Sequence, residues 1–197
     1  MKQNFMTRGM GVILDRTIRR DVPDKAVRKA VRTEYDAVLA RASDIGSSNR
    51  LLSSYALAAW FIGMDRNTGL TPEENIHILE ENLRRSFLLK HFMGSAKSYF
   101  SQKHIDGCKE WSRETRKETY PNDWVVDVVD GGSDFRFGFD YTQCGVCKLC
   151  RDEGCPQLAK YLCSLDFMLV EIIGVGLRRT TTLAEGGDRC DFRFYEK

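Results

Sequence analysis

The hydrophobic periodicity of the chain changes at Pro121, and this change constrains the fold more than any other feature of the sequence. Before Pro121, apolar residues recur at helical spacing, as in Val27, Val31 and Tyr35. After it, aromatic residues alternate with other residues over residues 135–141, which is typical of a half-buried strand. The sequence therefore predicts an α+β fold in which N-terminal helices pack with a C-terminal antiparallel sheet.

The helical half, residues 1–120, is predicted to contain four helices. The second is apolar on most faces and should lie in the core, and the third begins with a capping box at Thr71 and Glu74. We expect these helices over residues 23–42, 50–64, 71–87 and 95–119.

The second half, residues 121–197, has the order β-hairpin, helix, β-hairpin. Gly131 and Gly132 turn the first hairpin, and Gly174 and Gly176 end the helix that starts at Pro156. We expect strands over residues 124–129, 135–141, 177–184 and 189–195, and a loop over 144–155. Because 197 residues can bury one core, we predict a single domain, residues 1–197.

Composition excludes several classes of protein. A formal net charge of +2 argues against a nucleic-acid binder held by phosphate contacts. The basic stretch through Arg41 is interpreted as a solvated helix face, with a nucleic-acid-binding arm as the alternative. The longest apolar stretch, residues 55–64, is too short to span a membrane, and no export signal precedes it. The odd number of cysteines, seven, indicates thiols rather than disulfides. We therefore expect a cytoplasmic protein that binds a small molecule; a homo-oligomer is left open.

The most specific local motif is Cys144-x2-Cys147-x2-Cys150-x4-Cys155, which is followed by Pro156. Thiolates at this spacing can converge on a zinc ion or an iron–sulfur cluster. The alternative is a loop of thiols in a reducing compartment. The cofactor is therefore unknown, with zinc or an iron–sulfur cluster as candidates.

A second candidate site is distributed along the second half. Cys163 and Asp166 lie three residues apart, on one face of the predicted helix. Cys144 follows one predicted strand and Cys190 begins another, so the hairpin–helix–hairpin order can bring them together. A thiol beside a carboxylate supplies a nucleophile and a proton acceptor. The alternative is that each cysteine only fills space in the core.

Several segments resemble a known family. They are FDYTQC (residues 139–144), CSLD (163–166), RTTTLAEGGDRCDFRF (179–194) and, more weakly, IGSSN (45–49). The chain in this respect is similar to the L-2-amino-thiazoline-4-carboxylic acid hydrolase family, which is distantly similar to four-vinyl-reductase-like sensor domains. Cys147, Cys150 and Cys155 go beyond the family pattern.

The resemblance implies a hydrolase that opens a five-membered cyclic amidine carboxylate to N-carbamoyl-cysteine. As a hypothesis, Cys163 or Cys190 attacks the amidine carbon, or a cysteine-bound metal activates water, and Asp166 delivers a proton to the departing ring nitrogen. The full set of expected residues is Cys144, Cys163, Asp166 and Cys190 for catalysis, and Asn49, Arg179 and Asp191 for substrate binding. The alternatives are a non-catalytic sensor module that binds a metal, a cluster or a small ligand, and a structural protein with incidental thiols.

Overall fold

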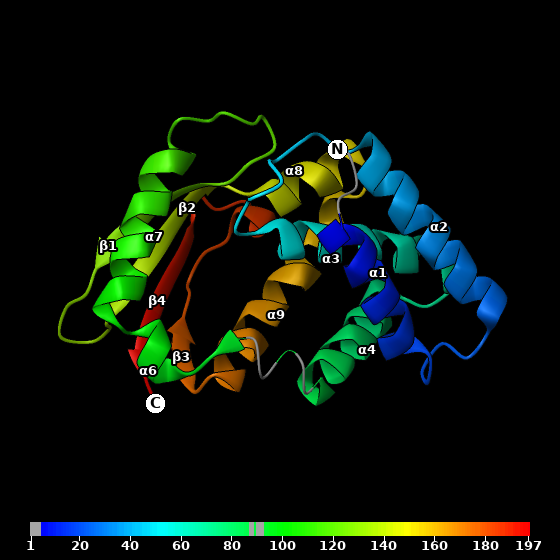
Figure 1. Cartoon of the computed structure of the whole chain (residues 1–197), viewed down its shortest axis with the longest axis horizontal. Coiled ribbons are helices and arrows are strands. Elements are labelled where there is room, and N and C mark those ends of the chain that lie inside the picture. Colours follow the sequence, from blue (N-terminus) through cyan, green and yellow to red (C-terminus); the bar gives the residue numbers. More distant parts are fainter. Residues whose placement is uncertain (1–4, 87–88, 90–92) are drawn as a thin grey trace. The chain divides into compact units, whose positions relative to one another are not determined.

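The computed structural model describes residues 5–86, 89 and 93–197, and within them the chain has the predicted α+β fold (Figure 1). The chain divides into two compact units. The helical unit contains residues 5–86, 120–122 and 145–162, and the sheet unit contains residues 89, 93–119, 123–144 and 163–197. The expectation of one domain over residues 1–197 stays a prediction.

The helical unit is built around α3, which is buried along most of its length. Helix α3 contacts α1, α2, α4 and α8. Gly63 lets α3 approach α2 closely, because a Cβ at this position would lie 2.8 Å from the carbonyl oxygen of Val31. The bounds of these elements are α1 Phe5–Ile18, α2 Lys25–Arg41, α3 Leu52–Asn67, α4 Pro72–Arg85, α8 Gly145–Asp152 and the 3₁₀ helix η1 Pro156–Leu158.

The three helices predicted over residues 23–42, 50–64 and 71–87 are present with small shifts of their ends. Asp24 caps α2 by accepting a hydrogen bond from the amide of Ala26, so Pro23 precedes the helix. The predicted capping box of Thr71 and Glu74 begins α4. Phe87, which was expected on the apolar stripe of this helix, lies outside the described residues.

Helix α1 was not predicted from the sequence. Its buried positions are Thr7, Gly11, Leu14 and Ile18, which have helical spacing. Only two of the four are large apolar residues, so the periodic hydrophobic signal was weak.

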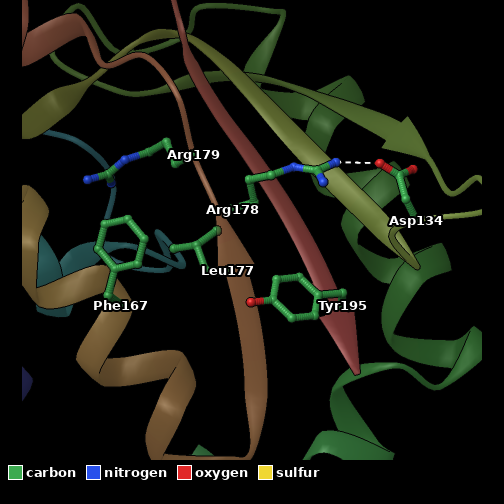
Figure 2. A pocket seen from close by; sticks show the side chains of 6 residues that line it. All are labelled: Asp134, Phe167, Leu177, Arg178, Arg179 and Tyr195. Atoms are coloured by element: carbon green, nitrogen blue, oxygen red, sulfur yellow. Dashed lines mark hydrogen bonds and ion pairs between the residues drawn. The ribbon is translucent and has the colours of Figure 1, made fainter. Parts of the chain in front are cut away.

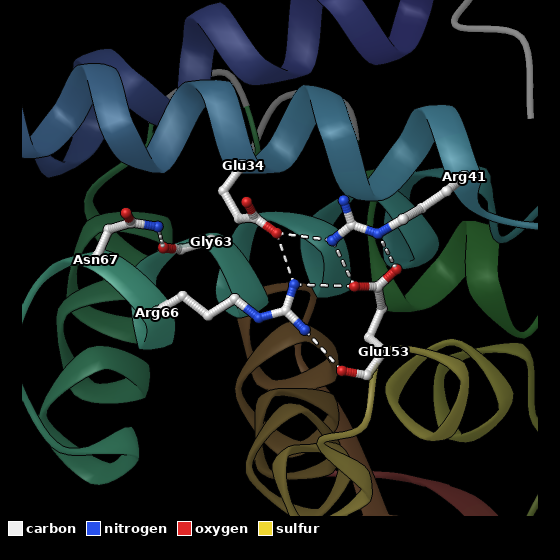
Figure 3. Close-up of polar contacts among 6 residues, drawn as sticks. All are labelled: Glu34, Arg41, Gly63, Arg66, Asn67 and Glu153. Atoms are coloured by element: carbon white, nitrogen blue, oxygen red, sulfur yellow. Dashed lines mark hydrogen bonds and ion pairs between the residues drawn. The ribbon is translucent and has the colours of Figure 1, made fainter.

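A network of charged side chains joins α2, α3 and the turn after α8 (Figure 3). The carboxylate of Glu153 is bound by Arg41 at 2.6 Å and by Arg66 at 2.9 Å, and Glu34 binds the same two guanidinium groups. The side chain of Glu153 is only 5% exposed. Buried carboxylates normally require such paired partners, and the network therefore fixes the end of α8 within the helical unit.

The sheet unit contains a four-stranded sheet with the order β1-β2-β4-β3, in which all neighbours are antiparallel. Both predicted hairpin pairs, β1 with β2 and β3 with β4, are confirmed. Helix α7 packs against β1, and the hydroxyl of Ser112 donates to the carbonyl of Val126. The bounds are β1 Val125–Asp130, β2 Phe137–Gln143, β3 Val175–Arg178, β4 Cys190–Glu196, α6 Ala96–Tyr99, α7 Gln102–Thr115 and α9 Ala159–Ile172, which begins in the helical unit.

The core of the sheet unit lies on the sheet face that carries the alternating aromatic residues. Phe137 and Phe194 pair across β2 and β4, and their rings lie 5.2 Å apart. Tyr99 of α6 packs on both, with ring centroids 5.4 and 5.2 Å away. The alternation that predicted the strands therefore also identified the buried face.

Three expectations for residues 95–176 were wrong in detail. The helix expected over residues 95–119 is two helices, because Ser101 caps a new start by accepting from the amide of His104. Residues 145–152 of the expected cysteine loop form α8. Gly176 lies inside β3 rather than after a helix.

The strand expected over residues 177–184 ends instead at Arg178. The amides of Thr180 and Thr181 donate to the carboxylate of Asp191, at 2.8 and 2.7 Å. Because these amides bond a side chain, they are not available to a neighbouring strand. Residues 183–185 then form the short 3₁₀ helix η2, Leu183–Glu185.

Among residues 5–86, 89 and 93–197, none of the helices combines the length and the hydropathy that crossing a bilayer requires.

Candidate functional site

Four of the residues expected to be catalytic gather in the sheet unit. Cys144 follows β2, Cys163 and Asp166 lie on α9, and Cys190 begins β4. The thiols of Cys163 and Cys190 each interact electrostatically with the other, with Cys144 and with Asp166. We call these four residues the thiol–carboxylate cluster. The structure thus brings together thiols that are up to 46 positions apart in the sequence numbering, from Cys144 to Cys190.

The strand register accounts for this gathering. Cys190 pairs with Tyr141 across β4 and β2, and Cys144 follows Tyr141 by three residues. On α9, the three-residue spacing places Cys163 and Asp166 on one face. The sulfur of Cys190 also accepts a hydrogen bond from the amide of Leu183, the first residue of η2, at 3.2 Å.

Arg179 is bound to this cluster. Its Nη1 lies 2.6 Å from Oδ2 of Asp166, and its Nη2 donates to the carbonyl of Cys163 at 3.0 Å. The guanidinium lies between the rings of Phe167 and Phe192, 4.9 and 5.1 Å from their centroids. The Arg179 side chain is 7% exposed. Arg179 was expected to bind substrate, and this role stays a prediction; in the structure it holds the cluster carboxylate.

The electrostatics of the cluster favour a carboxylate that titrates near neutral pH. Burial raises the pKa of Asp166 to about 6, and Arg179 opposes this rise. Burial also raises the pKa of the Cys190 thiol to about 11, against the hydrogen bond from Leu183, and it raises the pKa of Cys163 far above its ordinary value. At neutral pH the carboxylate can accept a proton, whereas both thiols are protonated.

The two remaining residues expected to bind substrate have structural contacts. Burial alone would raise the pKa of Asp191, but hydrogen bonds from Thr180 and Thr181 lower it, and this carboxylate shapes the loop after β3. Asn49 belongs to the helical unit, where its amide donates to the carbonyl of Ile45 and accepts from the amide of Leu51. Substrate binding by these two residues stays a prediction.

The cysteines of the predicted metal motif are divided between the two units. Cys144 belongs to the sheet unit, and Cys147, Cys150 and Cys155 belong to the helical unit. The thiol of Cys150 forms a hydrogen bond with the thiol of Cys155, and this hydrogen bond lowers the pKa of Cys155. All seven cysteines are thiols, and within the described part of the chain no three His, Cys, Asp or Glu side chains are arranged to hold a metal ion. Metal binding by this motif stays a prediction.

The sequence did not identify Tyr141 or the two aromatic rings around Arg179 as parts of the site. Burial raises the pKa of the Tyr141 hydroxyl well above its ordinary value, and the charges of Asp166 and Cys144 add to this rise. Its ring lies 5.3 Å from that of Phe192. The available signal was the strand alternation, which places Tyr141 on the same face as its partner Cys190.

Comparison with known proteins gives one match. A family model described as L-2-amino-thiazoline-4-carboxylic acid hydrolase matches residues 49–194, a range that contains the whole thiol–carboxylate cluster. No curated protein and no solved structure matches the chain.

Proposed function

Because the chain belongs to the L-2-amino-thiazoline-4-carboxylic acid hydrolase family, we propose that it hydrolyses a small cyclic amidine that carries a carboxylate. We place this reaction at the thiol–carboxylate cluster. The observation that carries the proposal is Asp166, a carboxylate with a pKa of about 6 beside the thiols of Cys163 and Cys190. A group that titrates near neutral pH is suited to accept and return a proton during catalysis.

The contacts of Asp166 suit an amidine. Nη1 of Arg179, one arm of a planar N–C–N fork, donates to Oδ2, and a protonated cyclic amidine carries the same kind of fork. Within the described residues, Oδ1 of Asp166 accepts no hydrogen bond. A substrate amidine can therefore bind Oδ1 while Arg179 keeps Oδ2.

Of the two thiols on which attack was expected to depend, Cys190 is the better nucleophile. Burial raises the pKa of both thiols, but that of Cys190, about 11, lies below that of Cys163, which burial and the charge of Asp166 raise further. The amide of Leu183 also stabilises the Cys190 thiolate. The pKa of bulk water is about 15.7, so direct attack by unassisted water requires a harder proton transfer. We assign the attack to Cys190 and the acceptance of its proton to Asp166.

The reaction then has two steps. The sulfur of Cys190 adds to the amidine carbon, and the bond from that carbon to the ring sulfur breaks. The ring sulfur takes the proton that Asp166 holds, which leaves an isothiourea on Cys190. Water adds to the same carbon, and one of its protons passes to Asp166. The thiol of Cys190 leaves with that proton, and the remaining hydroxyl proton goes to the former ring nitrogen as the carbonyl forms.

The net reaction adds one water and gives an N-carbamoyl amino acid with a new thiol. In this product the ring nitrogen stays attached to the former amidine carbon. The earlier hypothesis that the ring nitrogen departs is therefore wrong, because the atom balance requires the ring sulfur to leave. A carbon–sulfur bond breaks rather than a carbon–nitrogen bond.

The test combines turnover with detection of the covalent intermediate. We expect the wild-type protein to convert 2-amino-thiazoline-4-carboxylate to N-carbamoyl-cysteine, and Asp166→Asn and Cys190→Ala to lose about a hundredfold or more in kcat. Mass spectrometry of acid-quenched wild-type protein should show an adduct with the full mass of the substrate on Cys190. Cys147→Ala is the matched control, because Cys147 is a half-buried helical cysteine outside the cluster.

Circular dichroism must show that each variant is folded. Full activity in folded Asp166→Asn would contradict the role of the carboxylate. An adduct on Cys163 with normal turnover in Cys190→Ala would reassign the nucleophile. No turnover by the wild-type protein under any of the assayed conditions would overturn the proposed reaction.

A further inference from the structure

The outer face of α1 carries large apolar side chains that remain exposed. Of the large apolar side chains that are exposed among the described residues, four lie on α1 and three lie elsewhere. The four are Phe5, Met6, Val12 and Ile13, which are 95%, 44%, 44% and 47% exposed. Phe5 and Val12 are seven residues apart, as are Met6 and Ile13. They therefore form two adjacent rows along about two turns of one helix face.

The three other exposed side chains form smaller groups. In the helical unit, the ring of Tyr120 lies against Gly46. In the sheet unit, Phe167 and Tyr195 line an open groove along β3 (Figure 2). Helix α1 therefore carries the largest group of exposed apolar side chains in the described part of the chain, and such a group is typical of an interaction surface.

The inner face of α1 is held within the helical unit. The hydroxyl of Tyr35 in α2 donates to the carbonyl of Thr7 at 2.6 Å, and Arg28 of α2 pairs with Asp15 at 3.5 Å. Gly11 permits this close packing, because a Cβ at this position would lie 2.8 Å from the ring of Tyr35. These contacts fix the orientation of α1, so its two apolar rows face outward.

The apolar face is also basic. Arg8 lies four residues before Val12 and Arg16 lies four residues after it, so both lie on the same side of the helix as Val12. Arg19 follows the last turn. Within the described residues, the guanidinium groups of Arg8, Arg16 and Arg19 have no ion-pair or hydrogen-bond partner. Their charges are therefore available to an anionic partner.

These charges disfavour a second copy of the chain as the partner. Contact between the outer faces of two α1 helices would bring their arginines together, and like charges across an interface oppose association. The carboxylates among residues 5–22 are Asp15 and Asp21, and they are already paired with Arg28 and Arg20. The face therefore complements an anionic surface rather than itself.

An anionic lipid surface fits this pattern better than a groove on an acidic protein. Phe5 is almost fully exposed, so neighbouring side chains do not fix the position of its ring. Protein interfaces depend on closely packed anchors, whereas the fluid boundary between lipid head groups and acyl chains accepts such a ring without a shaped pocket. Long arginine side chains beside the apolar rows can reach the lipid phosphates.

We propose that the outer face of α1 binds to membranes that contain anionic lipids. Helix α1 has 14 residues, and about 20 are needed to span a bilayer, so the helix lies along the membrane surface. The strength of such binding depends on buried apolar area and on attraction to anionic lipid, so both the apolar rows and the arginines are needed. The inference is independent of the proposed reaction.

The test is co-sedimentation of the full chain with phosphatidylcholine vesicles that either contain or lack phosphatidylglycerol. Binding should be about tenfold or more tighter with phosphatidylglycerol, and high salt should weaken it. Arg16→Gln should weaken binding to these anionic vesicles by about fivefold, the contribution of one arginine near such a surface. Phe5→Ser should weaken it by about tenfold, because an inserted aromatic ring is lost.

Each variant has a matched control outside α1. Arg113→Gln removes an exposed arginine of α7, and Tyr195→Ser removes an exposed aromatic residue of β4. Both controls should bind vesicles as the wild-type protein does. In Phe5→Trp, the emission that exceeds that of the wild-type protein should shift to the blue on anionic vesicles and should be quenched by brominated lipids.

Several results would overturn the proposal. They are equal binding to neutral and anionic vesicles, unchanged binding in folded Arg16→Gln or Phe5→Ser, and equal losses in the two controls. No binding to any vesicle would also overturn it. In that case, a dimer in sedimentation velocity that Phe5→Ser dissociates would assign the face to a second copy. Binding of polyglutamate that Arg16→Gln weakens would assign it to an acidic protein instead.

Discussion

Replacement of Arg179 by glutamine should raise the pKa of Asp166 and move the acid limb of the activity profile to higher pH. Burial raises this pKa to about 6 in the wild-type protein, and Arg179 is the group that opposes the rise. A neighbouring arginine lowers a carboxyl pKa by about 1–3 units. Because the Asp166 side chain is 34% exposed, solvent screens part of this interaction, and we expect the lower end, about one unit.

The expected size of the effect follows from the ionised fraction of Asp166. With a pKa of about 6, the carboxylate is about 90% ionised at pH 7 and about 10% at pH 5. With a pKa near 7 in Arg179→Gln, about half is ionised at pH 7. The value of kcat/KM at pH 7 should therefore fall about twofold through this titration alone, and the loss should shrink above pH 8.

The titration of Asp166 also makes the free energy of unfolding depend on pH, with the opposite sign to that of an ordinary salt-bridged carboxylate. The pKa of Asp166 is about 6 in the folded protein and about 3.9 in the unfolded chain, so the folded state binds more protons in that window. The contribution of Asp166 to the free energy of unfolding therefore falls as the pH rises from about 4 to about 6. In Arg179→Gln the free energy of unfolding should fall more steeply with pH than in the wild-type protein, because the pKa of Asp166 in the folded state is higher.

The assay is kcat/KM measured from pH 4.5 to 9 for the wild-type protein, Arg179→Gln and Arg136→Gln. Arg136 is an exposed arginine whose ion pair is with Glu196, so the control changes the net charge without touching Asp166. The carboxyl band in infrared difference spectra against Asp166→Asn reports the titration directly. An acid midpoint near 4 in the wild-type protein, or an unshifted midpoint in folded Arg179→Gln, would refute the reasoning.

Three further predictions concern both units. Glu153→Gln should lower the free energy of unfolding by about 1–3 kcal/mol in urea titrations, because the Glu153 carboxylate is buried and paired with two arginines. Burial raises the pKa of Glu153, but the arginines hold this pKa below its ordinary value. The stabilisation by Glu153 should therefore be lost as the pH falls. Asp191→Ala should lower the melting temperature, with a loss of about 2 kcal/mol, because three hydrogen bonds to the threonine loop disappear; an unchanged melting temperature would count against this role. Alkylation of Cys163 and Cys190 at pH 7 should be about tenfold or more slower than that of an unfolded cysteine peptide, because their pKa values are raised, and mass spectrometry of peptides can measure it.

The parts of the fold that were predictable from the sequence are those where one local pattern coincides with the tertiary contacts. The alternation over residues 135–141 predicted β2, and the same aromatic face packs into the core. The capping box of Thr71 and Glu74 was predicted and is present because it depends only on neighbouring residues. The gathering of Cys144 and Cys190 could be expected from the hairpin order, since antiparallel strands bring such ends together.

Features that depend on partners far apart in the sequence were not predictable. Thr180 and Thr181 have high strand propensity, but the carboxylate of Asp191 takes their amides, and no local pattern reveals this. The closely spaced cysteines predicted a loop over residues 144–155, where the structure has α8. The pairing of Arg179 with Asp166 also depends on packing between the segment after β3 and α9, so the sequence could not distinguish it from a substrate-binding arginine.

The position of Arg179 determines how strong a base Asp166 can be. Without the cation, only about half of this carboxylate would be ionised at pH 7. A carboxylate that is fully paired would have too low a pKa to take a proton from a thiol. The guanidinium between Phe167 and Phe192 gives an intermediate result, a pKa of about 6. These two aromatic rings fix the orientation of a cation without accepting its hydrogen bonds. They therefore hold in place the cation that offsets part of the rise that burial causes in the pKa of Asp166.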